Sequence, residues 1–374
     1  MRSSTSSSER THCGSGFPWA VVVAACLVAL VEVAVHLTPT RSLLGYGEGL
    51  GTYYEVRHTI EDKGAAEVSV LGESRGRESI VMPDLDKLSE GRLGREIYTA
   101  NYSCPDAKST DMLLVTREMM SARTKPKLVV YVISSRGLLG DDHSVQREEV
   151  FGVFPNEYGH GTAQKLASFS EYPLWQVRNA LQRHYYTFRY RYRFRNVFAS
   201  VPRHRAMLSP VQGEETTWQR YMPNRSLATN PISDAHIQDY VARLLDADGK
   251  YVMGQTRVEA LREIVALCAR NGVKLAFVAA PISDDLNRHL PAGTQERFRE
   301  IVRNVANEGG VPFLTPEDLG LSFDRSDFRE QSHLNRRGAE KVTKAVVDQV
   351  VVPALGPAGG GAVGQVPTSG GSTS

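Results

Sequence analysis

Cysteine is scarce in this sequence, with four residues in a chain of 374. The four are Cys13, Cys26, Cys104 and Cys268, and none stands at the C-x-x-C spacing typical of metal and redox sites. A disulfide framework is therefore excluded, and the one disulfide that the body of the chain could form joins Cys104 and Cys268. His160 also lacks a partner at metal-ligand spacing. We therefore expect no metal ion and no cofactor.

An excess of charge of either sign is also missing. Lysine and arginine total 44 and aspartate and glutamate total 42, which gives a formal net charge of +2. A dedicated nucleic-acid-binding protein usually carries a strong basic excess, so we expect no nucleic-acid partner. The hydrophobic content of 41% is ordinary for a globular protein, and the length suffices for one large α/β domain.

One long apolar run is present near the N-terminus, over residues 17–37. As a helix this run covers about 30 Å, the thickness of a bilayer core. Arg2 and Arg10 precede it, which favours a cytoplasmic location for residues 1–16. The sequence thus predicts a single transmembrane anchor at the cell membrane, with the main domain extracytoplasmic (periplasmic). A cleaved signal peptide, or a lipoprotein cleaved before Cys26, is the alternative.

Short apolar runs and helical patterns alternate through most of the remaining chain. The strand-like runs are 67–71, 96–101, 127–133, 274–280 and 311–314, and the helix-like runs include 109–122, 256–271, 293–307 and 337–352. This alternation predicts an α/β fold, a three-layer α/β/α sandwich with a parallel sheet. We expect a polar linker over 38–65, the α/β domain over 66–355 and a disordered tail rich in glycine and serine over 356–374.

The alternation stops in a predicted insert at 137–250, which we expect to be mostly helical. Aromatic residues and arginines interleave over 185–195. The simplest interpretation is a regular segment with buried aromatics and outward-pointing arginines. Contact with anionic lipid headgroups or with an acidic polysaccharide is the main alternative, and contact with nucleic acid fits the net charge less well.

Two stretches carry candidate chemistry. The first, Gly72–Gly76, reads G-x-S-x-G and follows the apolar run 68–71, which places Ser74 at the end of a strand. This strand is the first of the sheet, unlike the strand that carries the nucleophile of an α/β-hydrolase. Taken alone, the pattern is equally typical of a turn or of a serine that caps a helix.

The second stretch places an acid, Glu330, three residues before His333 and just ahead of a helical pattern. A serine hydroxyl is a poor nucleophile until a base takes its proton, and the base needs a third group to orient it. Ser74, His333 and Glu330 supply these three parts, with Asp327 as a second candidate for the acid. Because ligands bind at the carboxyl ends of parallel strands, Ser74 and His333 are expected at the same sheet edge.

These stretches resemble the conserved blocks of the SGNH (GDSL-like) hydrolase superfamily. Gly72–Arg75 is similar to the first block, G-[DNS]-S-R, and 327–340 is similar to the last, D-x-x-H-L-N-x-x-G. Within the superfamily the chain most resembles the membrane-anchored extracytoplasmic branch, which includes proteins of alginate O-acetylation and of D-alanyl transfer to teichoic acid. The resemblance covers about 66–135 and 255–350.

The resemblance implies that Ser74 is the nucleophile and His333 the general base, with Glu330 in the place of the family's aspartate. It implies an extracytoplasmic esterase or O-acyltransferase acting on a cell-envelope or secreted polysaccharide. The expected partners are an acyl donor, a polysaccharide or other ester substrate, and an integral membrane acyltransferase. Hydrolase and transferase differ in whether water or a sugar hydroxyl takes the acyl group, and the sequence leaves both open.

The residues that would stabilise an oxyanion depart from the family pattern. The family's second-block glycine and third-block asparagine have no match here, and Ser103 and Arg136 stand in those regions. The Ser103 amide and the Arg136 guanidinium are the expected substitutes. Arg75 either assists a negative charge or forms a surface salt bridge. These departures support an alternative, a catalytically inactive glycan-binding or assembly component with the same fold.

Overall fold

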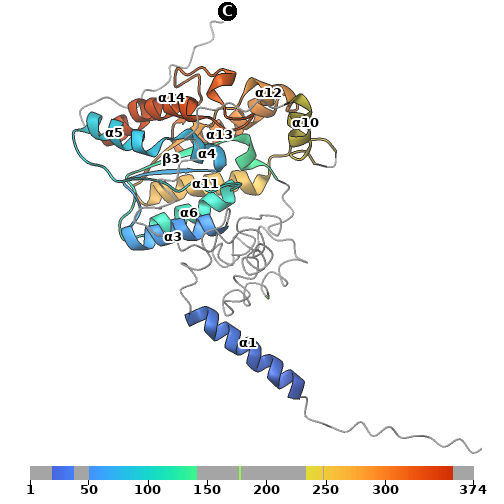
Figure 1. Ribbon diagram of the computed structural model, residues 1–374. Coiled ribbons are helices and arrows are strands. Elements are labelled where there is room, and N and C mark those ends of the chain that lie inside the picture. The colour runs from blue at the N-terminus through green and yellow to red at the C-terminus, as the bar shows by residue number, and fades with distance from the viewer. Residues whose placement is uncertain (1–18, 38–49, 141–176, 178–232, 247, 357–374) are drawn as a thin grey trace, which may run out of the picture.

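The computed structural model describes residues 19–37, 50–140, 177, 233–246 and 248–356 (Figure 1). The expected aromatic and arginine segment at 185–195 and the expected tail beyond Gly356 lie outside these residues.

Five parallel strands form a single sheet in the order β2-β1-β3-β4-β5. The strands are β1 Val68–Gly72, β2 Thr99–Asn101, β3 Leu128–Ile133, β4 Lys274–Ala279 and β5 Phe313–Leu314. All residues of β1 and β3 are buried, as is typical of the central strands of a parallel sheet. The expectation of an α/β fold with a parallel sheet is confirmed.

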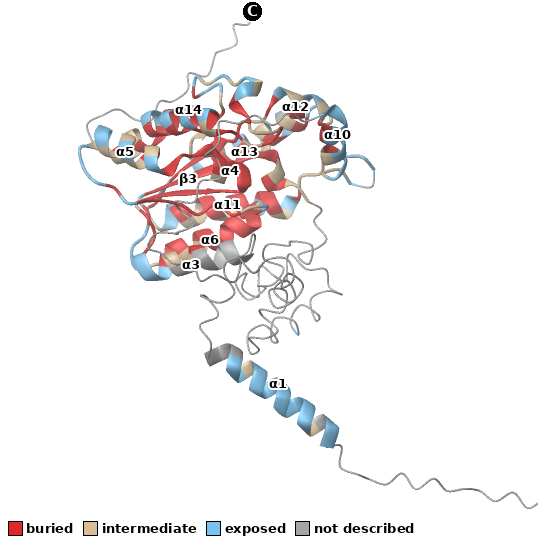
Figure 2. Ribbon diagram, viewed as in Figure 1, coloured by how far each residue is buried: buried red, intermediate tan, exposed pale blue. Residues whose placement is uncertain are grey.

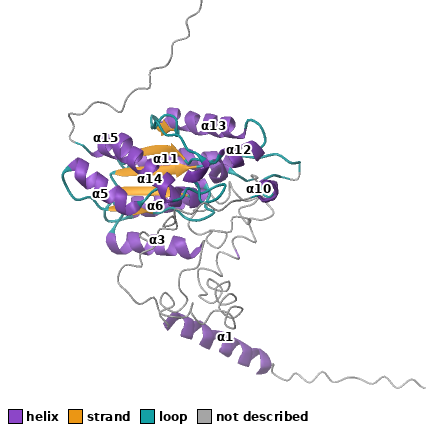
Figure 3. Ribbon diagram, turned by 45° about the horizontal axis from the view of Figure 1, so that its top comes forward, coloured by secondary structure: helices purple, strands orange, loops and turns teal. Residues whose placement is uncertain are grey.

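Helices cover both faces of the sheet (Figures 1 and 3). On one face lie α3 Leu50–Lys63, α6 Ser109–Ser121, α11 Gln255–Arg270 and α13 Thr294–Gly309. On the other lie α4 Ser74–Ser79, α5 Met82–Leu93, α14 Arg336–Val346, a π-helical turn Val347–Val351 and α15 Val352–Leu355. Shorter elements are the 3-10 turns Ser135–Leu138 and Arg325–Asp327, with α10 Asp234–Ala242 and α12 Asp284–His289.

The two faces of the sheet are packed separately because successive strand residues point to opposite sides. Tyr131 and Phe277, with ring centroids 5.7 Å apart, belong to the core under α6 and α11. Val130 and Val278, one residue earlier and later, belong to the core under α5 and α14. Figure 2 shows the sheet and the inner sides of these helices as the buried interior.

The strand order places a switch point between β1 and β3. β2 lies on one side of β1, and the chain then crosses to β3 on the other side. In such sheets the connections leave a crevice at the carboxyl ends of the two strands, where ligands bind. Ser74 follows β1 and Ser134 follows β3, so both lie at this crevice.

The expected polar linker at 38–65 is wrong for residues 50–63. These residues form helix α3, which packs on α6 and buries Val56 and Ile60 in the core. The two side chains stand four residues apart and therefore share one face of the helix. A single apolar stripe among many polar residues was too weak a pattern to predict the helix.

The N-terminal apolar run contains helix α1, Trp19–Leu37. Its large apolar side chains are mostly exposed, among them Trp19 and Leu30. Within the part of the chain that the structure describes, no helix has the length and apolarity needed to cross a membrane, so the transmembrane anchor predicted over 17–37 gains no support. Cys104 and Cys268 are both free and buried, so the one disulfide considered for the body is not formed.

The described end of the insert is helical. Helix α10 packs against α12 through a small apolar cluster that includes Ile237, Val241 and Leu286. Residues 141–176, 178–232 and 247 of the insert lie outside the described residues.

Candidate active site

Ser74 is held at the carboxyl end of β1 by a tight strand-to-helix turn. The strand ends at Gly72 and α4 begins at Ser74. Gly72 is required here, because a Cβ atom would lie 2.6 Å from the backbone oxygen of Val132 and 2.8 Å from Cα of Gly76. The turn leaves Ser74 8% exposed, at the carboxyl end of β1.

His333 reaches Ser74 from the far end of the chain. Its Nε2 atom lies 2.9 Å from Ser74 Oγ, and its Nδ1 atom is hydrogen-bonded to the carboxylate of Glu330. The structure thus brings together the serine, histidine and acid expected from the sequence. Burial favours the protonated acid, but hydrogen bonds from His333 and Ser332 hold the pKa of Glu330 below its usual value.

A tight loop before α14 presents this pair. Phe328 and Leu334 form an antiparallel bridge, and the Arg329 amide donates to the His333 carbonyl at 2.9 Å. Ser332 sits inside the loop, with its hydroxyl 3.1 Å from Glu330 Oε1 and 3.0 Å from His333 Nδ1. The loop therefore fixes both the acid and the ring that it orients.

Asp327, the second candidate for the acid, is placed elsewhere. Its fully buried carboxylate contacts Lys341 Nζ at 2.7 Å and Arg337 Nε at 3.2 Å, both on α14. Its own backbone oxygen accepts the amide of Asn335, the residue that caps α14. Asp327 therefore anchors the loop to the helix. The spacing of the motif favours Glu330 over Asp327, and in the structure Glu330 is the acid that contacts His333.

A second ion pair ties the loop to the serine. Arg329 Nη2 lies 3.0 Å from the carboxylate of Glu78, which is buried on α4. Because α4 starts at Ser74, this pair joins the two segments that must meet for the hydrogen bond between Ser74 and His333 to form.

Glu73, between Gly72 and the serine, is a site residue that sequence reasoning missed. It is 3% exposed, and its Oε2 atom lies 3.2 Å from Ser74 Oγ. Its Oε1 atom accepts the hydroxyl of Ser134, which in turn accepts Nη1 of Arg75 at 3.0 Å. Burial raises the pKa of Glu73, but the charges of Arg75 and Arg136 outweigh burial and lower it to about 2.

Two arginines and a tyrosine form a hydrogen-bonded cluster beside Glu73 and Ser74. Arg75 Nη2 and Arg136 Nη1 both donate to the hydroxyl oxygen of Tyr240, at 3.2 Å and 3.4 Å. Arg136 also pairs with Asp106 at 2.6 Å. Arg75 is 3% exposed, so it is not the surface salt bridge considered as one alternative. Tyr240 comes from α10, so the insert contacts Arg75, the residue next to the serine; no sequence pattern marked it.

Ser103 is not available as the expected oxyanion donor. It is fully buried behind Gly72, and its amide donates to Asn101 Oδ1 at 3.0 Å. The side chain of Asn101, at the end of β2, accepts the Ser103 amide, so this amide cannot donate to an oxyanion. Asn101 could have indicated this from the sequence, because asparagine side chains often accept the backbone amide two residues later.

Comparison with known proteins adds no assignment. A scan of models of protein families finds none that matches this chain, and a search among curated proteins finds no significant match. The functional argument therefore stands on the residues and geometry of the site.

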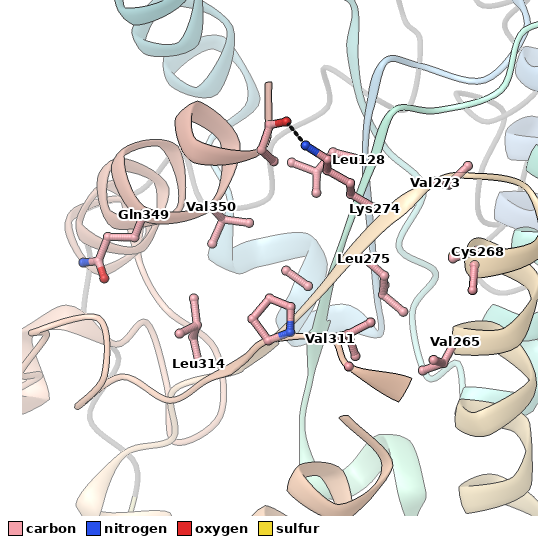
Figure 4. A pocket seen from close by; sticks show the side chains of 15 residues that line it. Leu128, Val265, Cys268, Val273, Lys274, Leu275, Val311, Leu314, Gln349 and Val350 are labelled. Atoms are coloured by element: carbon pink, nitrogen blue, oxygen red, sulfur yellow. Dashed lines mark hydrogen bonds between the residues drawn. The ribbon is translucent and has the colours of Figure 1, made fainter. Parts of the chain in front are cut away.

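Within the described residues, no group of histidine, cysteine, aspartate and glutamate side chains could hold a metal ion. A cavity of about 300 Å³ lies at the opposite edge of the sheet, beside the amino ends of β3 and β4 (Figure 4). Leu128, Lys274 and Val311 line it, and Lys274 Nζ donates to the Ala354 carbonyl at 2.6 Å. Since Ser74 lies at the carboxyl ends, this cavity is not part of the candidate active site.

Proposed function

We propose that the protein is a serine esterase or O-acyltransferase of the SGNH type. The observation that carries the proposal is the continuous hydrogen-bonded chain from Ser74 through His333 to Glu330 at the switch point of a parallel sheet. A serine that follows the first strand and an acid–histidine pair that precedes the last long helix match the order of the resembled superfamily. The three-layer sandwich of that superfamily is the fold we assign.

In the proposed reaction, Ser74 Oγ attacks the carbonyl carbon of an ester while His333 Nε2 takes the hydroxyl proton. Glu330 stabilises the resulting imidazolium. The tetrahedral intermediate collapses when His333 gives this proton to the leaving oxygen, which leaves an acyl group on Ser74. Water or a sugar hydroxyl then attacks, His333 takes its proton, and Ser74 is released with that proton returned to it.

The oxyanion needs donors near Ser74. The Ser74 amide is the first of α4 and has no acceptor within that helix. Tyr240 is the second donor that we assign, because both arginines donate to its oxygen and the hydroxyl keeps its own proton to donate. Arg136, whose side chain is 22% exposed and lies beside Tyr240, adds positive charge.

The acceptor, the location and the partner acyltransferase are proposed from the resemblance alone. We propose a cell-envelope or secreted polysaccharide as the acyl acceptor and an extracytoplasmic site of action.

A second candidate is a binding or assembly component without activity. It is favoured by the Ser103 amide, which is bonded to Asn101 rather than directed at the crevice. The two candidates differ in a simple assay, the hydrolysis of p-nitrophenyl acetate by the full-length protein. We expect turnover that is lost in Ser74→Ala and kept in Ser103→Ala, a matched serine that contacts neither His333 nor Glu330. A folded wild-type protein that hydrolyses no faster than Ser74→Ala would contradict the esterase proposal.

A further inference from the structure

The β5 edge of the sheet covers only part of β4. β5 has two residues, and Phe313, the first of them, pairs with Phe277 of β4. β4 begins earlier, at Lys274, so among the described residues the start of β4 has no neighbouring strand on this side. The cavity of about 300 Å³ lies beside this uncovered start of β4 (Figure 4).

The lining of the cavity comes from both cores of the molecule. Val265 and Cys268 belong to the core under α11, whereas Leu128 and Val350 belong to the core under α14. Elsewhere the sheet separates the two cores, because successive residues of each strand point to opposite faces. Here the two cores meet around the uncovered edge of β4, with Val265 and Val350 on opposite sides of the strand (Figure 4).

The backbone amide of Leu275 faces this space. In parallel pairing, successive residues of a strand direct their amides to opposite neighbours. The Lys274 amide donates to Lys127, on the β3 side, and the Phe277 amide donates to Pro312, on the β5 side. Leu275 therefore directs its amide to the β5 side, where no described residue accepts it. Leu275 is buried, and a buried amide without an acceptor is rare.

Two residues prevent β5 from extending along this part of β4. Carried back along the strands, the register of β4 with β5 would pair the Leu275 amide with the carbonyl of Gly310. Gly310 ends α13 in the left-handed conformation, with φ at 63°, and so lies outside the strand region. The Leu275 carbonyl would need an amide at Pro312, and proline has none. The sequence itself therefore keeps this edge of β4 open.

Lys274 brings positive charge to the mouth of the cavity. It is an exposed residue of the lining, and its amino group donates to the Ala354 carbonyl at 2.6 Å. An ammonium group has three N–H donors, so two remain for other acceptors. Among the described residues, no aspartate or glutamate lines the cavity and none forms an ion pair with Lys274. An anion is therefore the partner that complements this mouth.

We propose that the cavity binds a small carboxylic acid with an apolar chain. The chain lies against the apolar lining, and the carboxylate lies at the mouth, where Lys274 donates a charge-assisted hydrogen bond. The Leu275 amide is a further donor in the wall. The proposal does not rest on the proposed function, because the cavity is at the amino ends of β3 and β4 whereas Ser74 is at the carboxyl end of β1.

The volume of the cavity limits the length of the acid. A cavity of about 150 Å³ holds benzene, so about 300 Å³ suits a ligand of roughly ten to twelve non-hydrogen atoms. Octanoate has this size. Acetate leaves most of the apolar lining without contact, so it should bind far more weakly than octanoate.

The test is calorimetric titration of the full-length protein with octanoate, with octanol as a probe of equal chain length and no charge. We expect one octanoate site per chain, and tighter binding of octanoate than of octanol or acetate. NMR of methyl-labelled protein locates the site. We expect octanoate to shift the methyl signals of Val265, Leu275 and Val350, each assigned by substitution of that residue.

Two variants separate the role of the apolar chain from that of the carboxylate. Lys274→Met keeps the apolar stem and removes the charge, so we expect about tenfold weaker binding of octanoate and unchanged binding of octanol. Lys344→Met, at an exposed lysine of α14 outside the lining, is the matched control and should bind both probes like the wild type. Val311→Phe fills the cavity and should abolish the binding of both probes.

Equal affinities of the wild type for octanoate and octanol, or an equal weakening of both in Lys274→Met, would overturn the proposal of a carboxylate site. The absence of octanoate binding at millimolar concentration would overturn it as well. So would methyl shifts confined to residues outside the cavity, or undiminished binding by a folded Val311→Phe protein. Should Val311→Phe fail to fold, the methyl shifts of the wild type decide the location by themselves.

Discussion

Ser74 Oγ and His333 Nε2 lie 2.9 Å apart, although 259 positions separate the two residues in the chain. The parallel sheet explains this proximity. Ser74 follows β1, an interior strand of the sheet, and His333 lies in the loop that enters α14, which packs against α4. The buried core fixes α14 against α4, and the loop that enters α14 then brings His333 to Ser74.

Glu330 is expected to orient His333 by its charge. Replacing it by glutamine keeps the size of the side chain but lets the amide stabilise the wrong tautomer of the ring. By analogy with other serine, histidine and acid triads, we expect the rate of p-nitrophenyl acetate hydrolysis to fall by about 10⁴-fold. The melting temperature of Glu330→Gln should stay close to that of the wild type. Unchanged kcat in a folded Glu330→Gln protein would remove Glu330 from the site.

Asp327 is expected to matter for stability rather than for the reaction. Its buried carboxylate pairs with Lys341 and Arg337, so Asp327→Asn leaves two cations without their partner. We expect a loss of about 2 kcal/mol in the free energy of unfolding, measured with urea. The hydrolysis rate per folded molecule should stay within a few-fold of the wild type. A loss as large as that of Glu330→Gln would instead mean that Asp327 acts on His333.

The ion pair of Arg329 with Glu78 is expected to hold the loop that carries His333 against α4, which begins at Ser74. Arg329→Met and Glu78→Gln should each lower kcat more than they lower the melting temperature, because the loop loses its link to α4. The double variant should cost little more than either single one, with a coupling of about 1 kcal/mol. Additive effects on kcat would show that the pair does not act as a unit.

The ionisation of Glu73 is expected to make the free energy of unfolding depend on pH in the acidic range. Burial alone would raise its pKa, but the charges of Arg75 and Arg136 lower it from 4.5 to about 2. A carboxyl with a lowered pKa in the folded state stabilises the fold above its unfolded pKa and loses this contribution as the pH falls through the folded value. We therefore expect the free energy of unfolding to decrease from about pH 4.5 down to about pH 2.

Glu73→Gln should flatten this decrease, while Glu330, whose pKa is also lowered, keeps part of the slope. Thermal melts at several pH values measure both proteins. The same acid dependence in the wild type and in Glu73→Gln would show that Glu73 is not an ionised buried group.

The sequence predicted those features that depend on local patterns. The ranges of β1, β3 and β4 differ from the expected ones by one residue at one or both ends, because uninterrupted apolar runs bounded by polar residues are distinctive. Ser74 and Glu330 could be placed for a similar reason, since a strand end and a helix start mark them. Helix α3 could not, because Val56 and Ile60, which it buries, form only a weak apolar stripe in the sequence.

Local sequence patterns could not predict the cluster of Arg75, Arg136 and Tyr240. Tyr240 approaches Arg75 across 165 positions, and nothing in the neighbourhood of Tyr240 marks it as different from other helix tyrosines. Glu73 lies inside the stretch that carries Ser74. Its role in the site depends on contacts with Arg136 and Ser134, which follow β3 and are brought close by the pairing of β1 with β3. The roles of Tyr240 and Glu73 depend on contacts between residues that are far apart in the chain. No spacing or motif in a single sequence predicts such contacts.

The most direct test of the account is the site of covalent labelling. The full-length protein is treated with a fluorophosphonate and the adduct is located by mass spectrometry of its peptides. We expect one adduct, on Ser74, that is absent from Ser74→Ala, strongly slowed in His333→Gln and unchanged in Ser103→Ala. A folded wild-type protein that remains unlabelled, or that is labelled on a serine other than Ser74, would contradict the proposed role of Ser74 and His333.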